Sequence, residues 1–410
     1  MALARPTVLR RELDQTLPDR PFAIEFWDGS ALPATNGAGG PAFRVKSPQA
    51  VAHALRAPGQ LGLGRAYVAG DLEVDDLDAV IALLDGWKPP PLDRAARARL
   101  ALAAVRAAGV TRPPPRPASE LVPRGRRHSR ARDARAVRHH YDVSNDFFAL
   151  VLDESMTYSC ALFRDGADTL EDAQRAKHEM VCRKLALEPG ERVLDVGCGW
   201  GAFARHAARE HGVHVTGITL SEPQARLARE RAAAAGLGDQ IEIRVMDYRD
   251  VPASERYDAV ASIGMVEHVG VVQIDDYARH LARVLRPGGR LLNHGIARLR
   301  HSDPEAGPFS ERYVFPDAAP LHLSRSTLAL ERAGFVTEHV EGFAADYART
   351  LTHWIDRLDA NLDEARCLAG DERVRVWRLY LRAARNGFQS GFTSIYQARC
   401  SLPDEAGASP

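Results

Sequence analysis

The chain has 410 residues, enough for two or three domains, and 45% of them are hydrophobic, as in proteins that bury a sizeable core. Its 54 basic and 54 acidic side chains give a formal net charge of zero, so no overall charge draws it to nucleic acid. Five scattered cysteines without a CxxC pair argue against a disulfide framework and favour a reducing, cytoplasmic setting; no metal site is expected. No run approaches the roughly 20 apolar residues of a membrane span, and the N-terminus lacks the apolar core of a signal peptide. Any membrane contact is therefore expected to be peripheral.

Residues 1–110 predict a small α+β domain. Short β-like pieces, "PFAIEFWDGS" and "PAFRVKS", alternate with the helix-like pieces "SPQAVAHALRA" and "DDLDAVIALLDGW". Residues 111–138 are rich first in proline and then in arginine, which is typical of a linker.

The arginines of this linker have two interpretations, a solvated tether or a patch attracted to anionic lipid headgroups. Only Glu120 and Asp133 oppose them, and no aromatic residues are interleaved as a nucleic-acid site would require, so nucleic acid is not expected as a partner. The arginines are Arg112, Arg116, Arg124, Arg126, Arg127, Arg130, Arg132, Arg135 and Arg138.

Residues 139–410 predict an α/β domain. The apolar runs "RVLDVG", "HVTGITL", "IEIRVMD", "YDAVASIG" and "GRLLNHGIA" alternate with helix-like stretches, a pattern that favours a doubly wound parallel sheet. From about residue 304 to 400 this rhythm stops. "LTHWIDRLDANLDEARCLAG" and "DERVRVWRLYLRAARNGFQSGF" have helical periodicity, so we expect a mostly α-helical cap.

A glycine-rich turn, "LDVGCGWG", follows the first of these strands. Asp195 ends the strand, and Gly197, Gly199 and Gly201 let the backbone turn sharply and leave space for a ligand. The GxGxG spacing disfavours a dinucleotide, whereas an adenosine with an amino-acid tail can use Asp195 and the turn. Asp247, after the third strand, is placed to accept a hydrogen bond from an adenine amino group. A tight turn without a ligand is the alternative.

This constellation resembles class I S-adenosylmethionine-dependent methyltransferases, whose fold is a Rossmann-like doubly wound sheet. With "HHYDVSNDFFALVLDESMTYSCALF", "GITLSEPQ", "GMVEHVG" and "ADYARTLTHW", residues 139–400 closely resemble the cyclopropane-fatty-acyl-phospholipid synthase family, which includes tuberculostearic-type fatty acid methylene synthases. The resemblance implies S-adenosylmethionine as methyl donor. The positions that it implies contact this cofactor are Tyr141, Tyr158, Ser159, Gly197, Gly199, Thr219, Gln224, Asp247 and Tyr248.

The family's active site also holds a bicarbonate ion. The resemblance implies that its ligands here are Cys160, Glu267, His294, the backbone of Ile296, and Tyr347. Each residue also has an ordinary structural interpretation. Cys160 could be an inert core residue, Glu267 part of a loop ion pair, His294 a strand-end histidine bonded to backbone, and Tyr347 a helix-face aromatic.

The implied reaction is one-carbon transfer to the cis double bond of an acyl chain on a membrane phospholipid. The product is either a cyclopropane or a mid-chain methylene branch, and "NHGI" in place of the usual "HTI" favours the branch. Full reduction to a methyl branch would need a separate reductase. A homodimer is left open. The rival functions are a methyltransferase for a soluble small molecule and a non-enzymatic lipid-binding protein that keeps an inactive cofactor fold.

Overall fold

The computed structural model describes residues 6–35, 40–109, 114–122, 124–141, 143–164, 166–302 and 307–404. The chain forms two compact units. The first, here called the N-terminal unit, consists of residues 1–122 and 370–386; the second, the sheet unit, consists of residues 123–369 and 387–410. The late segment 370–386, expected in the cap of the α/β domain, thus groups with the N-terminal residues.

The N-terminal unit is a small α+β structure, as its sequence pattern predicts. Its sheet has the strand order β2-β1-β3-β4, and a core of Leu9, Phe26, Leu32, Ala103 and Ala107 packs beside it. The strands are β1 (Ala23–Glu25), β2 (Ala31–Leu32), β3 (Ala42–Val45) and β4 (Leu72–Val74). The helices are α1 (Thr7–Thr16), α2 (Pro48–Arg56), α3 (Gln60–Val68), α4 (Leu77–Gly86), α5 (Arg94–Ala108) and most of α16 (Asp371–Gln389).

Long-range polar contacts explain why most of α16 belongs to this unit. Arg382 is 5% exposed, and its guanidinium donates to the Asp78 carboxylate at 3.0 Å. Glu372 accepts a hydrogen bond from the Ser119 backbone amide at 2.9 Å. The helical pattern of α16 was visible in the sequence, but its partners were not.

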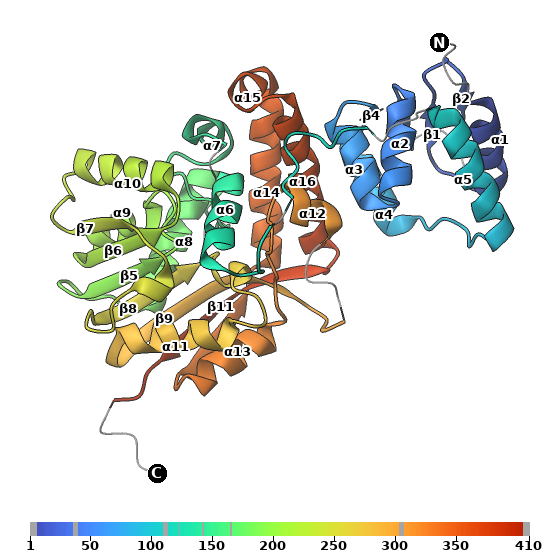
Figure 1. The fold of residues 1–410 in the computed structure, drawn as a ribbon. Coiled ribbons are helices and arrows are strands. Elements are labelled where there is room, and N and C mark those ends of the chain that lie inside the picture. The colour runs from blue at the N-terminus through green and yellow to red at the C-terminus, as the bar shows by residue number, and fades with distance from the viewer. Residues whose placement is uncertain are drawn as a thin grey trace. The chain divides into compact units, whose positions relative to one another are not determined.

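The sheet unit is built on a seven-stranded sheet with the order β10-β11-β9-β8-β5-β6-β7 (Figure 1). Its strands β5 to β9 coincide with the five predicted apolar runs and pair in parallel. They are β5 (Arg192–Val196), β6 (His214–Thr219), β7 (Ile241–Val245), β8 (Tyr257–Ile263) and β9 (Leu285–Arg298). The expected doubly wound fold is therefore present.

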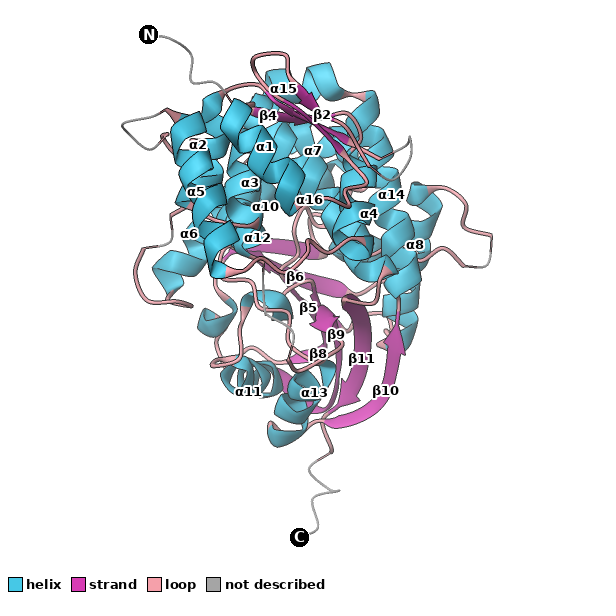
Figure 2. Cartoon of the chain, turned by 90° about the vertical axis from the view of Figure 1, so that its right-hand side faces the viewer, coloured by secondary structure: helices cyan, strands magenta, loops and turns pink. Residues whose placement is uncertain are grey.

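Helices cover both faces of this sheet, which is why its central strands are almost continuously apolar (Figures 1 and 2). One face packs against α8 (Leu170–Lys184), α9 (Ala202–His211) and α10 (Glu222–Ala234), through residues such as Val181, Ala204 and Ala228. The other packs against α11 (Ile274–Val284) and α13 (Leu323–Arg332), through Tyr277, Leu281 and Leu330.

Two strands extend the sheet within the region that was expected to be a mostly helical cap. They are β10 (Val336–Gly342) and β11 (Thr393–Ser401), and β11 pairs antiparallel with both β9 and β10. The predicted helices of the region are present as α14 (Ala344–Ala360), α15 (Leu362–Ala369) and α16, with the short α12 (Pro308–Tyr313) before them. The expectation was incomplete because the alternation in β11 is short and lies directly after a long helix.

The predicted linker also differs from expectation. Its described arginine-rich end forms α6 (Arg130–Tyr141), followed by α7 (Asn145–Val151), whose first turn is capped by Ser144 accepting from the Phe147 amide at 2.9 Å. Arg112 lies outside the described residues. Carboxylates of the sheet unit hold α6: Arg130 pairs with Asp250 at 2.6 Å, and Arg132 pairs with Asp317.

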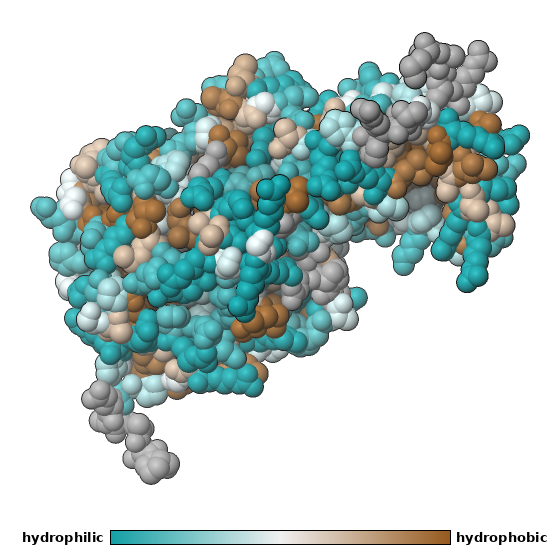
Figure 3. Space-filling model, viewed as in Figure 1, coloured by the Kyte–Doolittle hydropathy of each residue, from teal (hydrophilic) through white to brown (hydrophobic). Residues whose placement is uncertain are grey.

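No helix among the described residues is both long enough and apolar enough to cross a bilayer. On the face drawn in Figure 3, hydrophilic side chains cover most of the sheet unit, whereas hydrophobic ones gather beside α5 in the N-terminal unit. Leu102 and Val105 of α5 are 50% and 57% exposed.

Candidate active site

The glycine-rich turn joins β5 to α9 and leaves its backbone open on one side. Gly197 has φ +81° and Gly199 has φ +53°, conformations that residues with a side chain rarely adopt. The amides of Gly197 and Cys198 both donate to the Ile218 carbonyl at 3.0 Å, which ties the turn to β6. The turn therefore lies where β5 and β6 end, at the edge where parallel α/β sheets bind ligands.

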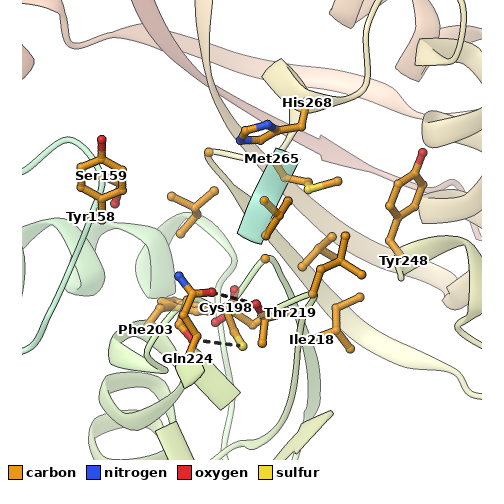
Figure 4. A pocket seen from close by; sticks show the side chains of 18 of the residues that line it. Tyr158, Ser159, Cys198, Phe203, Ile218, Thr219, Gln224, Tyr248, Met265 and His268 are labelled. Carbon is orange, nitrogen blue, oxygen red and sulfur yellow. Dashed lines mark hydrogen bonds between the residues drawn. The ribbon is translucent and has the colours of Figure 1, made fainter. Parts of the chain in front are cut away.

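A cavity of about 150 Å³ opens above this turn. In Figure 4, Tyr158 and Ser159 lie on one side, Tyr248 lies on the opposite side, and Thr219 and Gln224 lie near the turn. Thr219 Oγ1 donates to Gln224 Oε1 at 2.8 Å, which orients both side chains. All the positions expected to contact the cofactor line the cavity: Tyr141, Tyr158, Ser159, Asp195, Gly197, Gly199, Thr219, Gln224, Asp247 and Tyr248.

Asp195 and Lys177 are two buried titratable groups in the cavity wall. Burial raises the pKa of Asp195 to about 7, against the opposing effect of Lys177, and burial lowers the pKa of Lys177 to about 8. Asp195 Oδ2 has no hydrogen-bond partner among the described residues, and Lys177 Nζ donates to Ser159 Oγ at 3.1 Å. An amino group beside Asp195 and a carboxylate beside Lys177 would give each side chain a partner of complementary charge. The amino-acid tail of S-adenosylmethionine carries both of these groups.

Asp247 is more heavily engaged than its sequence position suggests. Arg249 donates its backbone amide to Asp247 Oδ1 at 3.0 Å and its guanidinium to both carboxylate oxygens. Burial alone would raise the pKa of Asp247, but the hydrogen bonds from Arg249 lower it overall. The carboxylate therefore stays ionised and keeps lone pairs for a further donor.

Helix α6 supplies part of the same cavity wall. Asp133, Val137 and Tyr141 line the cavity, and Asp133 accepts from Arg249 Nη2 at 2.9 Å. Trp200, from the glycine turn, donates its indole N–H to Asn145 at the start of α7 at 2.8 Å. The segment that was predicted to be a linker thus folds over the cofactor pocket.

A second cavity of about 70 Å³ adjoins the first and shares with it the walls formed by Tyr141, Tyr158, Ser159, Ile263, Gly264 and His268. Its remaining lining includes Glu267, His294, Ile296 and Tyr347, the residues that the sequence resemblance groups together. Phe315, Ala318, Pro320 and Ile395 complete a mostly apolar wall. The structure therefore brings most of the expected catalytic set to one place.

Glu267 lies in the 3-10 turn η2 (Val266–His268) just after β8 and is 7% exposed. Its Oε1 accepts the backbone N–H of Ile296 at 2.7 Å, so that N–H holds Glu267 in place. Its Oε2 has no hydrogen-bond partner among the described residues. Burial raises the pKa of Glu267 to about 7, so the side chain carries a proton for much of the time near neutrality.

His294 lies in β9, opposite Ile263 of β8, and is held by a chain of polar groups. Lys184 Nζ, which also pairs with Glu341 at 2.7 Å, donates to Gln397 Oε1 at 2.8 Å. Because an ammonium group only donates, the Gln397 amide nitrogen faces His294 and donates to its Nδ1 at 3.3 Å.

These hydrogen bonds decide which nitrogen of His294 carries the proton. With Nδ1 accepting, the neutral ring has its N–H at Nε2, a buried atom without a hydrogen-bond partner among the described residues. Burial, reinforced by the charges of Lys177 and Lys184, lowers the pKa of His294 to about 3. His294 is therefore a neutral N–H donor over the physiological pH range.

Cys160 does not join the second cavity. Its side chain is 1% exposed, does not line that cavity, and donates to the carbonyl oxygens of Ala161 at 3.2 Å and Phe343 at 3.7 Å. Burial raises the pKa of the Cys160 thiol, so it stays protonated. Its observed side-chain environment matches the structural alternative, a small buried residue.

Sequence reasoning missed several residues of the site, above all Lys177. The signal was present, because the buried stripe of α8 runs through Ala173, Gln174, Lys177, His178 and Val181, and a lysine on such a stripe is unusual. Gln397 and Lys184 carried no comparable signal, since they lie far from His294 in the sequence.

Comparisons with known proteins agree with this geometry. Residues 128–398 match the family model described as mycolic acid cyclopropane synthetase. A probable fatty acid methyltransferase of Pseudomonas putida is 38% identical over 93% of this chain and 92% of its own. The cyclopropane-fatty-acyl-phospholipid synthase of Escherichia coli strain K12 is 34% identical over 91% of both chains. The crystal structure of the mycolic acid cyclopropane synthase CmaA1 with SAH and CTAB has a TM-score of 0.62 at 31% identity, covering 65% of this chain and 98% of that one.

The matched region spans both cavities and every residue that lines them, and the fold is that of the matched synthase. The chain therefore belongs to the mycolic acid cyclopropane synthetase family of S-adenosylmethionine-dependent methyltransferases.

Proposed function

We propose that this enzyme transfers a one-carbon unit from S-adenosylmethionine to the cis double bond of an acyl chain on a membrane phospholipid. The observation that carries the proposal is the second cavity. It is small, mostly apolar and next to the cofactor pocket, yet it contains Glu267 Oε2 and His294 Nε2, two polar atoms without a hydrogen-bond partner in the described part of the chain. Fatty-acyl and phospholipid substrates in the names of the relatives support the same substrate class.

The chemistry requires such a cavity. An alkene is a weak nucleophile; when it attacks the sulfonium methyl group, a C–C bond forms, the C–S bond breaks, and a positive charge remains on the acyl chain. Water would quench that cation, so the walls formed by Phe315, Pro320 and Ile395 must keep it dry. The rings of Tyr158 and Tyr347, which also line the cavity, can stabilise a nearby cation through their π faces.

The two unpaired polar atoms fit an anion. His294 Nε2–H and a protonated Glu267 are both donors, and the family resemblance makes bicarbonate the natural ligand, with Tyr347 as a further contact. Bicarbonate bound there supplies the weak base that accepts the last proton of the reaction. The role of Glu267 is then to donate a hydrogen bond rather than to oppose the anion with its own charge, and Ile296 acts through Glu267.

The fate of the cation decides the product. Loss of a proton from the new methyl group closes a cyclopropane ring, whereas a hydride shift before proton loss leaves a methylene branch. The "NHGI" motif around His294 supports the branch, whereas sequence identity does not separate the two products: the chain is 34% identical to the cyclopropane synthase and 33% identical to a tuberculostearic acid methyltransferase of Mycobacterium tuberculosis. A separate reductase would be needed to convert that branch to a methyl group.

Mass spectrometry of total fatty acids from cells that express this chain tests the function. We expect unsaturated acyl chains that are heavier by one methylene unit, absent from cells that express the His294→Ala variant, and fragmentation that locates a mid-chain methylene branch. Fragments typical of a ring would instead show that the product is a cyclopropane. An unchanged lipid profile, with S-adenosylmethionine consumed on a soluble compound, would refute the acyl substrate; no consumption at all would indicate a lipid-binding protein.

We further propose that the enzyme acts while peripherally attached to the cytoplasmic membrane surface. Exposed Leu102 and Val105 on α5 lie among the exposed arginines Arg94, Arg97 and Arg106, so this helix offers both apolar contact and positive charge to an anionic lipid surface. The arginine-rich segment contributes less than its composition suggests, because Arg130 and Arg132 are paired with carboxylates.

Vesicle flotation tests this attachment. Replacing the exposed Arg97 and Arg106 of α5 with Gln should weaken binding to anionic vesicles, and rising salt should weaken wild-type binding through screening. The exposed Arg209 and Arg226, replaced in the same way, form the charge-matched control. Equal binding to neutral and anionic vesicles would contradict the electrostatic part of the proposal.

A further inference from the structure

A second group of chemically reactive side chains lies in the sheet unit, outside both cavities. It joins two helices: Cys182 and Glu179 belong to α8, and His206 and His211 belong to α9. The Cys182 sulfur and one ring nitrogen of each histidine all lie within 4.8 Å of one another. We name this group the α8–α9 cluster.

Glu179 connects the two histidines. Its Oε2 lies 3.3 Å from His206 Nε2 and 3.1 Å from His211 Nε2, while its Oε1 accepts from Arg183 Nε at 2.8 Å. The carboxylate therefore lies against both of the histidine rings that could bind an ion. It can serve as a fourth ligand or as the group that orients both rings.

Burial also suits a closed ion site. Cys182 is fully buried, and the side chains of His206 and His211 are 13% and 19% exposed. The site is thus screened from solvent on the sulfur side, while the histidines leave a route for an ion to enter.

We propose that the α8–α9 cluster is a structural zinc site with Cys182, His206 and His211 as ligands and Glu179 completing the tetrahedron. Zinc prefers thiolate, imidazole and carboxylate ligands in four-coordinate geometry. With Zn–N near 2.0–2.1 Å and Zn–S near 2.3 Å, ligand atoms of a tetrahedral site lie about 3.3–3.8 Å apart. Side-chain adjustments of about an ångström would bring Cys182, His206 and His211, whose ligand atoms are at most 4.8 Å apart, to those values, and Glu179 would turn from the histidine nitrogens toward the ion as the fourth ligand. Binding releases the thiol proton of Cys182 to solvent and involves no redox change.

The position of the cluster suggests what the ion does. His178 of α8 and Phe203 of α9 line the cofactor cavity, and Cys182 and His206 follow them by about one helical turn. An ion there would fasten α8 to α9 directly behind the cofactor pocket. This role is independent of the acyl substrate proposed above.

The test uses the full-length chain, stripped with a chelator, incubated with Zn²⁺ and desalted before metal analysis. We expect about one zinc per chain for the wild type, and at least a tenfold loss of bound zinc for Cys182→Ser and for His211→Gln. Matched controls are Cys400→Ser, a buried cysteine on β11, and His214→Gln, an exposed histidine on β6, and both should retain the ion.

Cobalt provides a second measurement. Co²⁺ in the wild type should give the intense visible bands of tetrahedral coordination and a thiolate charge-transfer band that Cys182→Ser abolishes. Zn²⁺ should also raise the melting temperature of the wild type and not of His211→Gln. Because His211 is the last residue of α9 and partly exposed, its variant remains informative if Cys182→Ser fails to fold. Zinc content equal in the wild type and the ligand variants, or a wild type that retains no zinc after desalting, would overturn the proposal.

Discussion

Replacing Glu267 with Gln should make the enzyme more stable at alkaline pH than the wild type. In the folded protein, burial raises the pKa of Glu267 from 4.5 to about 7. Between those two values the unfolded chain has lost its proton while the folded chain still holds it, so wild-type stability falls as pH rises through this window. Above about pH 7 both states are ionised and the loss is complete.

The size of the effect follows from the shift. Each pKa unit corresponds to about 1.4 kcal/mol, so the full window amounts to about 3 kcal/mol, and roughly 2–3 kcal/mol of it falls between pH 5 and pH 8. Gln cannot ionise, and it can still accept from the Ile296 amide. The difference in unfolding free energy between Glu267→Gln and the wild type should therefore grow by that amount, in favour of Gln. Asp195, whose pKa burial also raises to about 7, is present in both proteins and cancels.

The assay is urea unfolding at pH 5 and pH 8, followed by hydrogen exchange in peptides from β8 and β9 so that the sheet unit is measured on its own. Glu154→Gln, at an exposed glutamate, is the control and should show no such growth. A difference that stays constant with pH would refute the description of Glu267 as a buried, raised-pKa acid. Wild-type kcat should decline as pH rises through about 7, because Glu267 then loses the proton that it donates. The Glu267→Gln variant should not show this decline.

Three further predictions concern the two cavities. Gly197→Val should abolish cofactor binding measured by calorimetry, because a β-branched residue is strained at φ +81° and intrudes on the ligand, whereas Gly238→Val, in open space with ordinary φ, should bind normally. His294→Ala should cut turnover by about 10²–10⁴ with cofactor affinity nearly intact, and removing bicarbonate should slow the wild type but not this variant; a joint loss of binding would contradict its role. Gly295→Ala should lower turnover at least tenfold in a folded enzyme, since a Cβ there would lie 2.1 Å from Val266 Cγ1 and displace the segment after β8; full activity would show that Val266 moves freely.

The sequence alone determined the parallel part of the sheet and the cofactor pocket, because their signals are local. Strand–helix alternation marked β5 to β9, and the glycines after Asp195 required a turn whatever the rest of the chain did. Family motifs then named the residues that line the two cavities, and the structure places all of them there except the Cys160 side chain.

Only the tertiary structure decided the chemistry of these residues and the neighbours of the remaining segments. Burial by distant segments, and not any local pattern, raises the pKa of Glu267 and lowers that of Lys177. The tautomer of His294 depends on Gln397, which reaches it because β11 pairs with β9. Likewise, α8 and α9 each show an apolar stripe in the sequence, but only their packing brings Cys182 to the α9 histidines. Periodicity indicates which face of an element is buried, but it does not indicate which residues that face contacts. The desolvation and the hydrogen bonds of the buried side chains depend on those contacts.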